Sequence, residues 1–162
     1  MTKWIFLAVF LMLSPFSTGQ AKAGACPSVQ NADVMLNQAS RLLEVARRKA
    51  GRRAITRDPL LDQAAQLQAC NVAINGYSAR RPHHGPDGST PKVRVKRTGY
   101  RTCLTAENLA LGQRRPETLV NDWMGSPKHR TNILNRKLRQ YGLAVANAGG
   151  KPVWIMVLAR PC

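Results

Sequence analysis

The stretch VWIMVL at residues 153–158 constrains the fold more than any other part of the chain. Successive side chains of a β-strand point to opposite faces of its sheet, and here the side chains for both faces are apolar. Such a strand is buried and needs a covering layer on each side. The apolar run YGLAVA at residues 141–146 precedes it, and Gly149-Gly150 lies between the two runs. This pattern predicts a β-hairpin whose second strand is central in the sheet.

Two long helical segments that could cover such a sheet come earlier in the chain. One follows Asp33 as its cap and stops at Gly51. Its apolar residues at near-helical spacing are Val34, Leu36, Leu42, Leu43, Val45 and Ala46. The other has Asp58 as N-cap, Pro59 at its first position and Gly76 at its end. Its apolar face is predicted to be Leu60, Leu61, Ala64, Leu67 and Ile74.

Shorter elements are predicted in the second half of the chain. Residues 103–111 form a strand that turns at Gly112, and residues 92–99 carry only a weak helix signal. Further helices begin at Pro116 and, behind Ser126 as cap, at Pro127. The buried side of the first of these is expected to be Leu119, Val120, Trp123 and Met124. Helices early and strands late, with a sheet covered on both faces, predict an α+β fold, a three-layer α-β-α sandwich.

The N-terminal residues have the features of a secretory signal peptide. Lys3 is followed by an apolar run at residues 4–13, and Ala21-Lys22-Ala23 is an A-x-A cleavage site. The run is too short to span a membrane. We therefore assign residues 1–23 to a signal peptide and residues 24–162 to a single domain of common size, and expect a secreted or periplasmic protein.

Four cysteines remain after that cleavage, and an even number in an exported chain predicts two disulfides. They are Cys26, Cys70, Cys103 and Cys162. Three pairings are open. We favour Cys26–Cys70 and Cys103–Cys162, because bridges from each end into the body would hold termini that otherwise fray. A cysteine zinc site is the alternative, but the chain has no C-x-x-C spacing to support it.

The chain is strongly basic, with 25 lysines and arginines against 8 acidic residues, a formal net charge of +17. Removal of Lys3 and Lys22 with the signal peptide leaves 23 − 8 = +15. Such a charge favours polyanionic partners such as envelope lipids, anionic glycans or nucleic acid, although it also serves solubility alone. The run Arg47-Arg48-Lys49 lies at the end of the first helix, where positive charge complements the helix dipole.

Three residues could carry chemistry: His83, Glu107 and His129. Two imidazoles and a carboxylate are a common zinc ligand set, and the same groups can act as general acid and base. They lie 24 and 22 residues apart, so only the fold could bring them together. Each also has a structural alternative, since a glutamate can hold a loop and histidines in a Gly/Pro loop are often solvated.

The order of short motifs resembles the CAP superfamily, which joins cysteine-rich secretory proteins, antigen 5 and plant pathogenesis-related type 1 proteins. The motifs are H-x-G-x-DGS, AENLA, WMGSPKHRTNIL and YGLAV, and the similarity covers residues 36 to 159. They are most similar to the bacterial secreted branch, the SCP-domain proteins. The resemblance implies an α-β-α sandwich with a central, mainly antiparallel sheet.

The resemblance also implies a cavity lined by histidines and acidic residues that in some relatives binds Zn²⁺ or another divalent cation. Matching motif positions makes His83, Glu107 and His129 its metal ligands or, in a hydrolase, its catalytic residues. The eukaryotic branch has a glutamate after its tryptophan and a histidine in a G-H-Y-T-Q motif, and this chain lacks both. A metal would thus have three obvious ligands. Support around the cavity is expected from His84, Asn108, Ser126, Arg130 and Asn132.

Three functions follow as hypotheses. We favour a non-enzymatic, monomeric extracellular binding module for an anionic envelope component, a glycan, or a lipid or sterol. The chain has no G-x-S-x-G elbow, and its cysteines are expected in bridges. The alternative is a metal-dependent or His/Glu acid–base hydrolase, protease-like, in the same cavity. An inert scaffold is the third. A ribonuclease, and with it a nucleic-acid partner, is disfavoured because the fold that the resemblance implies is not known for ribonuclease activity.

Overall fold

The computed structural model describes residues 26–162, and the predicted signal peptide lies outside the described residues. The elements in chain order are α1 (Ala32–Lys49), β1 (Thr56–Arg57), α2 (Pro59–Asn75), α3 (Pro91–Arg97), β2 (Thr102–Leu111), α4 (Pro116–Gly125), α5 (Pro127–Ile133), β3 (Gln140–Ala148) and β4 (Lys151–Pro161). Among residues 26–162 no helix is long and apolar enough to cross a membrane. The weakly signalled helix at residues 92–99 is present as α3, and the two-residue β1 was not predicted.

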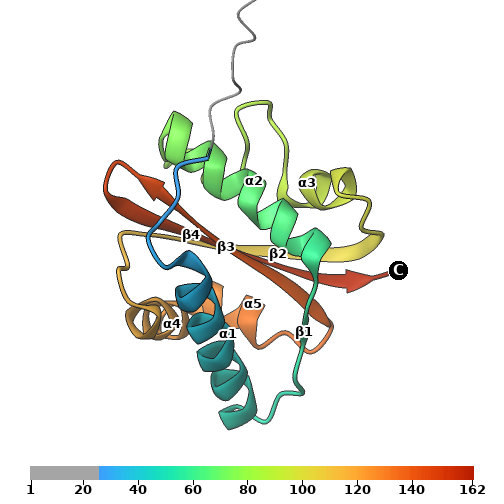
Figure 1. The fold of residues 1–162 in the computed structure, drawn as a ribbon. Helices are drawn as coiled ribbons and strands as arrows, with labels where there is room; N and C mark the ends of the chain where they lie inside the picture. Colours follow the sequence, from blue (N-terminus) through green and yellow to red (C-terminus); the bar gives the residue numbers. More distant parts are fainter. Residues whose placement is uncertain (1–25) are drawn as a thin grey trace, which may run out of the picture.

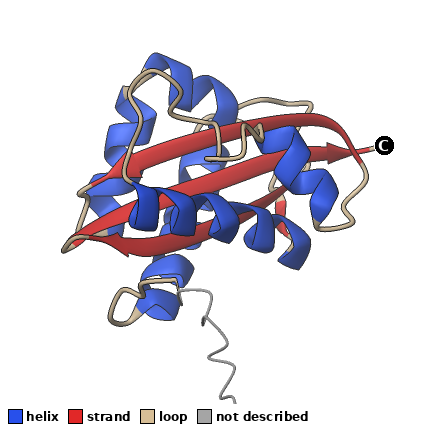
Figure 2. Cartoon of the chain, turned by 90° about the horizontal axis from the view of Figure 1, so that it is seen from above, coloured by secondary structure: helices blue, strands red, loops and turns tan. Residues whose placement is uncertain are grey.

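The sheet has the strand order β1-β3-β4-β2. β4 is antiparallel to both β3 and β2, and only the short β1 pairs in parallel, with β3. Figure 1 shows α2 and α3 on one face of this sheet and α1, α4 and α5 on the other, and Figure 2 shows the same layers from above. The predicted α+β three-layer sandwich with a mainly antiparallel sheet is confirmed.

Successive side chains of β4 point to opposite faces of the sheet, which explains why both faces of the sheet are covered. Its odd-numbered residues 153–159 belong to a core cluster with α2 and α3. Its even-numbered residues 154–158 belong to a second cluster with α1, α4 and α5. All residues from 153 to 159 are completely buried. The apolar run thus makes β4 the shared wall of two cores, as the sequence predicted for a central strand.

The capping of α2 is as predicted, but part of its predicted apolar face is wrong. The Asp58 side chain accepts hydrogen bonds from the backbone N–H groups of Leu60 at 2.9 Å and Leu61 at 3.3 Å. Leu67 and Ile74 are 46% and 55% exposed. A Cβ at Gly142 of β3 would lie 2.0 Å from the Leu61 backbone carbon, so α2 rests directly on the strand. At this separation mostly small side chains fit, and α2 buries Leu61, Ala64, Ala65, Gln68, Ala69 and Val72.

α1 differs from the prediction at its start. Its N-cap is Asn31, so Asp33 lies in the first turn, where its charge complements the helix dipole. Val34 is 63% exposed. The buried residues are Ala39, Leu43 and Arg47. They are spaced by four and therefore lie on one face, which places an arginine among the residues turned away from solvent.

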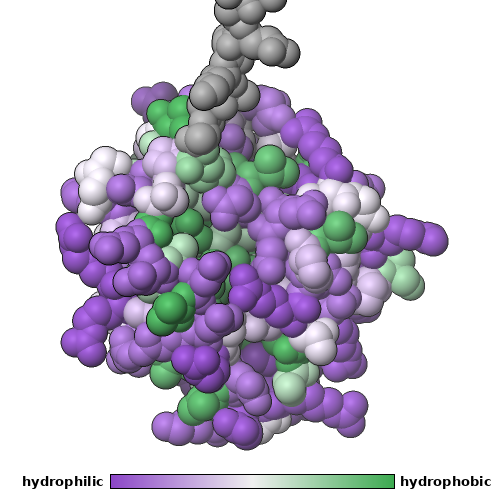
Figure 3. All heavy atoms as spheres, viewed as in Figure 1, coloured by the Kyte–Doolittle hydropathy of each residue, from purple (hydrophilic) through white to green (hydrophobic). Residues whose placement is uncertain are grey.

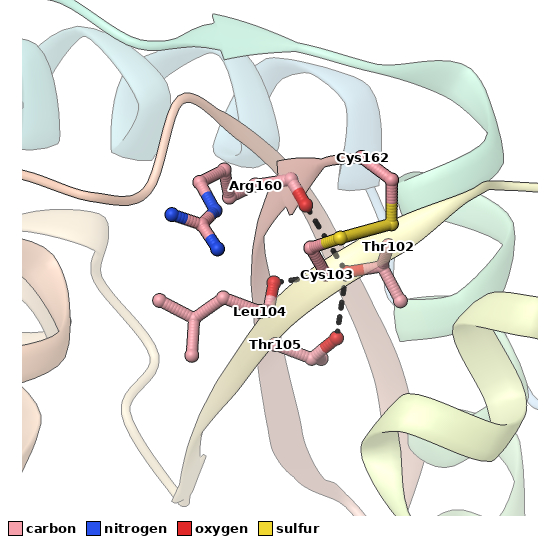
Figure 4. The surroundings of a disulfide bond; sticks show 6 residues. All are labelled: Thr102, Cys103, Leu104, Thr105, Arg160 and Cys162. Carbon is pink, nitrogen blue, oxygen red and sulfur yellow. Dashed lines mark hydrogen bonds between the residues drawn. A yellow bond between two sulfur atoms is a disulfide. The ribbon is translucent and has the colours of Figure 1, made fainter.

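Both favoured disulfides are present. Cys26–Cys70 ties the segment before α1 to α2, and Cys103–Cys162 ties the end of the chain to β2 (Figure 4). The register of β2 with β4 shifts between Thr102 and Leu104, which leaves Cys103 as the extra residue. The Thr102 hydroxyl spans the irregularity, 2.9 Å from the Leu104 carbonyl oxygen. The free end of β4 is thereby fixed to the edge of the sheet.

Candidate functional site

The neighbouring residues Glu107 and Asn108 point to opposite faces of the sheet. β2 is an edge strand, with Glu107 opposite Val157 and Asn108 opposite Met156. Directly opposite residues of an antiparallel pair share a face. Val157 packs in the α2/α3 cluster and Met156 in the α1/α4/α5 cluster. Glu107 therefore faces the α2/α3 layer from the middle of β2, and Asn108 faces the other layer.

The Glu107 carboxylate has a partner on each oxygen. Its Oε1 is 3.0 Å from His83 Nδ1, and its Oε2 accepts a hydrogen bond of 2.7 Å from Arg94 Nη2. The side chains of Glu107 and Arg94 are each 1% exposed, whereas that of His83 is 40% exposed. The site is thus a buried Arg–Glu ion pair with a histidine at its solvent side.

Sequence reasoning missed Arg94. Its guanidinium also donates to the Ser89 carbonyl oxygen at 2.8 Å and to the His83 carbonyl oxygen at 3.2 Å. It holds the loop before α3 from within, while Glu107 holds the His83 ring. Lys92, Lys96 and Arg97 flank Arg94 in the same short helix, so no local signal separates it from them. Only the packing of α3 on β2 identifies it.

On the other face of β2, two asparagines attach α5 to the strand. Asn108 Nδ2 donates to the His129 carbonyl oxygen at 3.1 Å, and Asn132 Nδ2 donates to Asn108 Oδ1 at 2.9 Å. Asn132 Nδ2 is also 3.4 Å from the Glu107 carbonyl oxygen. These bonds fix the backbone of α5 beside the edge strand. The support predicted from Asn108 and Asn132 is a hydrogen-bond link between helix and strand.

His129 lies on α5, in the layer opposite to Glu107. Burial, and secondarily the charge of His83, lower the pKa of the His129 imidazole below its ordinary value. The structure brings His83 onto Glu107, whereas His129 lies in the other layer, where its carbonyl oxygen accepts a hydrogen bond from Asn108.

The remaining predicted residues are Ser126, Arg130 and His84. Ser126 occupies the N-cap position of α5, but its side chain makes no capping hydrogen bond; its carbonyl oxygen accepts from the Arg130 N–H at 2.9 Å. The Arg130 side chain is exposed and lines a groove described below. His84 lines a different pocket of about 340 Å³ beside the end of α2.

The residues predicted as metal ligands do not fit a cation in this arrangement. Glu107 is already neutralised by a buried guanidinium, and both of its oxygens are engaged. Within residues 26–162 no three histidine, cysteine, aspartate or glutamate side chains are grouped so that they could hold a metal ion. The sequence-based prediction of metal binding by His83, Glu107 and His129 is therefore not carried further, and we derive no chemistry through it.

An apolar groove between α1 and α4 was not predicted from the sequence. It has a volume of about 490 Å³. Its apolar lining comes from Leu42, Val45, Ala46, Val120 and Met124, and its polar lining from Lys49, Glu117, Asn121 and Arg130. The periodicity assigned these apolar residues to the buried faces of the two helices, because local spacing does not show that Leu42, Val45, Ala46 and Met124 stay only partly covered.

Comparison of the sequence with known proteins finds a matching family model and a bacterial relative. The sequence model of the cysteine-rich secretory protein family (CAP) matches residues 41–158. The uncharacterized protein YkwD of Bacillus subtilis is 29% identical over 113 residues, which are 70% of this chain and 42% of YkwD. The chain thus spans less than half the length of that relative.

Solved structures share the fold. An outer surface protein from Borrelia burgdorferi aligns with a TM-score of 0.75 and 19% identity, over 85% of this chain and all of that one. An extracellular protein containing an SCP domain from Bacillus anthracis aligns with a TM-score of 0.69 and 21% identity, over 80% of this chain and 41% of that one. At these identities the likeness concerns the fold alone.

Proposed function

This chain belongs to the cysteine-rich secretory protein family, and from that premise we propose that it is a secreted, non-enzymatic module that binds an anionic lipid with a single apolar chain. The groove between α1 and α4 carries the proposal. Two disulfides and the extracellular SCP-domain relative support an extracytoplasmic location.

The shape and lining of the groove favour a lipid over a glycan. Pockets for small molecules are typically about 300–1,000 Å³ and mostly apolar, with few polar groups that orient the ligand. The groove, at about 490 Å³, has five apolar residues along its walls. The face seen in Figure 3 is largely hydrophilic, with apolar side chains in small patches over the region of α1 and α4. An alkyl chain would cover such apolar surface, and a sugar would not.

The polar lining favours a negative headgroup. Lys49 at the end of α1 and Arg130 on α5 both line the groove. Glu117 is the acidic residue in the lining, and its carboxylate already has other partners. It accepts a hydrogen bond from Gln38 and lies 3.6 Å from Arg115. Within residues 26–162 neither cation has a carboxylate partner, so two positive charges lie beside an apolar wall, which is the arrangement that an amphipathic anion requires.

The His83–Glu107 region supports the non-enzymatic part of the proposal. Glu107 is committed to Arg94 and His83, and the described residues, which include all four cysteines, contain no free thiol. A carboxylate that is neutralised and buried is a poor general base for activating water. We infer that these residues hold the loop, α3 and β2 together.

An isothermal calorimetric titration of the oxidised protein with dodecanoate tests the proposal. We expect one saturable site. Val45→Asp places a charge on the groove wall and should weaken binding more than about tenfold. Val34→Asp is the matched control, since Val34 lies on the same helix, is 63% exposed and is not in the lining, and it should leave binding unchanged.

The headgroup is tested with dodecyltrimethylammonium, which has the same chain and the opposite charge. It should bind more weakly, and Arg130→Gln should reduce the difference. No dodecanoate binding, or equal binding to both valine variants, would contradict the proposal. If the wild type hydrolyses an ester of dodecanoate and the His129→Gln variant does not, the result would instead support the hydrolase.

A further inference from the structure

A second pocket, of about 370 Å³, is lined almost entirely by arginine. Its lining residues are Arg47, Gly51, Arg52, Arg53, Arg136 and Arg139, which we call the arginine pocket. They come from the end of α1, the segment after it, and the segment between α5 and β3. Figure 3, in the orientation of Figure 1, shows mostly hydrophilic side chains at the end of the molecule where α1 stops.

The C-terminus of α1 builds one wall of this pocket. Gly51 has a φ of +64°, a conformation that glycine adopts without strain. The Gly51 N–H donates to the Arg48 carbonyl oxygen at 3.0 Å, and the Arg52 N–H donates to the Arg47 carbonyl oxygen at 2.9 Å. This pair of bonds is the Schellman motif, which turns the chain back at a helix end. It brings Arg52 and Arg53 over Arg47.

Arg47 forms the floor and is fixed in place. The residue is 2% exposed. Its Nε and Nη2 donate to the Arg53 carbonyl oxygen at 3.1 and 2.8 Å, and its Nη1 donates to the Ile133 carbonyl oxygen. Arginine has five N–H groups, so these contacts leave part of its donor capacity free. Arg52 is fixed similarly, with Nε donating to the Leu134 carbonyl oxygen at 3.1 Å.

The five positive charges have no carboxylate partner. All eight acidic residues of the chain fall within the described part, residues 26–162, and none of them lies within 4.0 Å of these guanidinium groups. Glu44, the acid nearest to Arg47 in the chain, lies 3.7 Å from Arg48 instead. Burial, and then the charges of Arg52 and Arg139, lower the pKa of Arg47.

The helix dipole offsets only part of this repulsion. The C-terminus of α1 carries roughly half a negative charge, against five guanidinium groups. Four of the five arginines lie outside α1, so the dipole does not explain why they converge. A bound anion would relieve the repulsion and would accept the free N–H groups.

We propose that the arginine pocket is a binding site for a phosphate group. Planar guanidinium groups hold phosphate oxygens in pairs of parallel hydrogen bonds, and a buried, pre-oriented arginine loses little freedom on binding. The site is separate from the lipid groove. Arg47 lies on the α1 face with Ala39 and Leu43, whereas the groove uses Leu42, Val45, Ala46 and Lys49 on an adjacent face. The proposal therefore does not depend on the proposed function.

Calorimetric titration with inorganic phosphate, at constant low ionic strength set by chloride, tests the site. The pocket variant is Arg136→Gln/Arg139→Gln, since both side chains are exposed and removing them should not unfold the protein. The control is Lys92→Gln/Arg101→Gln, which removes the same charge from exposed positions elsewhere. We expect one saturable site in the wild type, weakened about tenfold in the pocket variant and less than about twofold in the control.

Two results would overturn the inference: no saturable binding of phosphate, or equal weakening in both variants, which would assign the attraction to net charge. A further comparison distinguishes the source of the phosphate group. If the pocket variant loses more affinity for phosphatidylglycerol vesicles than the control variant does, the phosphate group belongs to a lipid headgroup. If the two variants lose vesicle affinity equally, the ligand is free phosphate. Dodecanoate binding should be unchanged in the pocket variant, so failure of this site and failure of the lipid groove are distinguishable.

Discussion

Replacement of Arg94 by methionine should destabilise the protein far more than the same change at Arg97. Methionine keeps the apolar stem of the side chain and removes the guanidinium. It leaves Glu107 buried without its charged partner, because the two side chains are 2.7 Å apart and each only 1% exposed. Removing one partner of a buried ion pair lowers the free energy of unfolding by about 3–5 kcal/mol. The carbonyl oxygens of Ser89 and His83 also lose their donor.

Arg97 is a matched control on the same helix. It pairs with Asp87 at 2.5 Å, but these side chains are 54% and 49% exposed. An exposed pair contributes about 0–1 kcal/mol, so Arg97→Met should cost less than about 1 kcal/mol. Urea denaturation at neutral pH with the disulfides intact gives the free energy of unfolding for each variant, provided the slope m is unchanged.

A double variant separates the ion pair from simple loss of packing. If the cost of Arg94→Met arises from the unpaired carboxylate, adding Glu107→Leu should recover much of it, because an apolar pair can replace a buried ion pair at little cost. An equal cost for Arg94→Met and Arg97→Met would refute the reasoning. So would a double variant that is less stable than Arg94→Met.

Four further predictions concern other parts of the molecule. Gly142→Ala should lower the free energy of unfolding by more than about 3 kcal/mol, because its Cβ would lie 2.0 Å from the backbone of α2. Gly125→Ala, whose Cβ would have no atom within 4 Å, is the control, and both variants are measured by the same urea denaturation. Burial lowers the pKa of His129 in the folded state below its ordinary value of 6.5. The stability is therefore fully present above that value and is lost as pH falls from it through the lowered pKa of the folded state. His129→Gln should flatten the measured pH dependence of the free energy of unfolding, and an unchanged slope would contradict the reasoning. Replacing both Cys103 and Cys162 by alanine frees a loop of 59 residues and should cost about 4 kcal/mol by loop entropy, measured against the oxidised wild type. Zinc titration should give no micromolar site, and a 1:1 site at that affinity would contradict the commitment of Glu107 to Arg94.

The sequence by itself determined the architecture, because its signals are local or concern the whole chain. The apolar run at residues 153–158 required cover on both faces, and the paired glycines at residues 149–150 placed the hairpin. Asp58 and Pro59 set the start of α2 through backbone N–H groups only two and three residues away. The sequence left three cysteine pairings open and only favoured the one that the structure shows, because two of the cysteines lie near the ends of the predicted domain.

Only the tertiary structure decided the content of the site. Glu107 and His83 were identified as candidates, but their partner Arg94 is one of several basic residues in a short helix, and its burial depends on how α3 packs on β2. The alternation of β2 sends Glu107 and Asn108 to different layers, so His129 approaches from the other side of the sheet edge. Likewise, arginines 47 and 139 are far apart in sequence and share a pocket because α1 and the segment before β3 end at the same place. Helix and strand signals act over a few residues, whereas convergence of charges depends on contacts between elements, and that is why the sequence determined the layers and only the fold determined the sites.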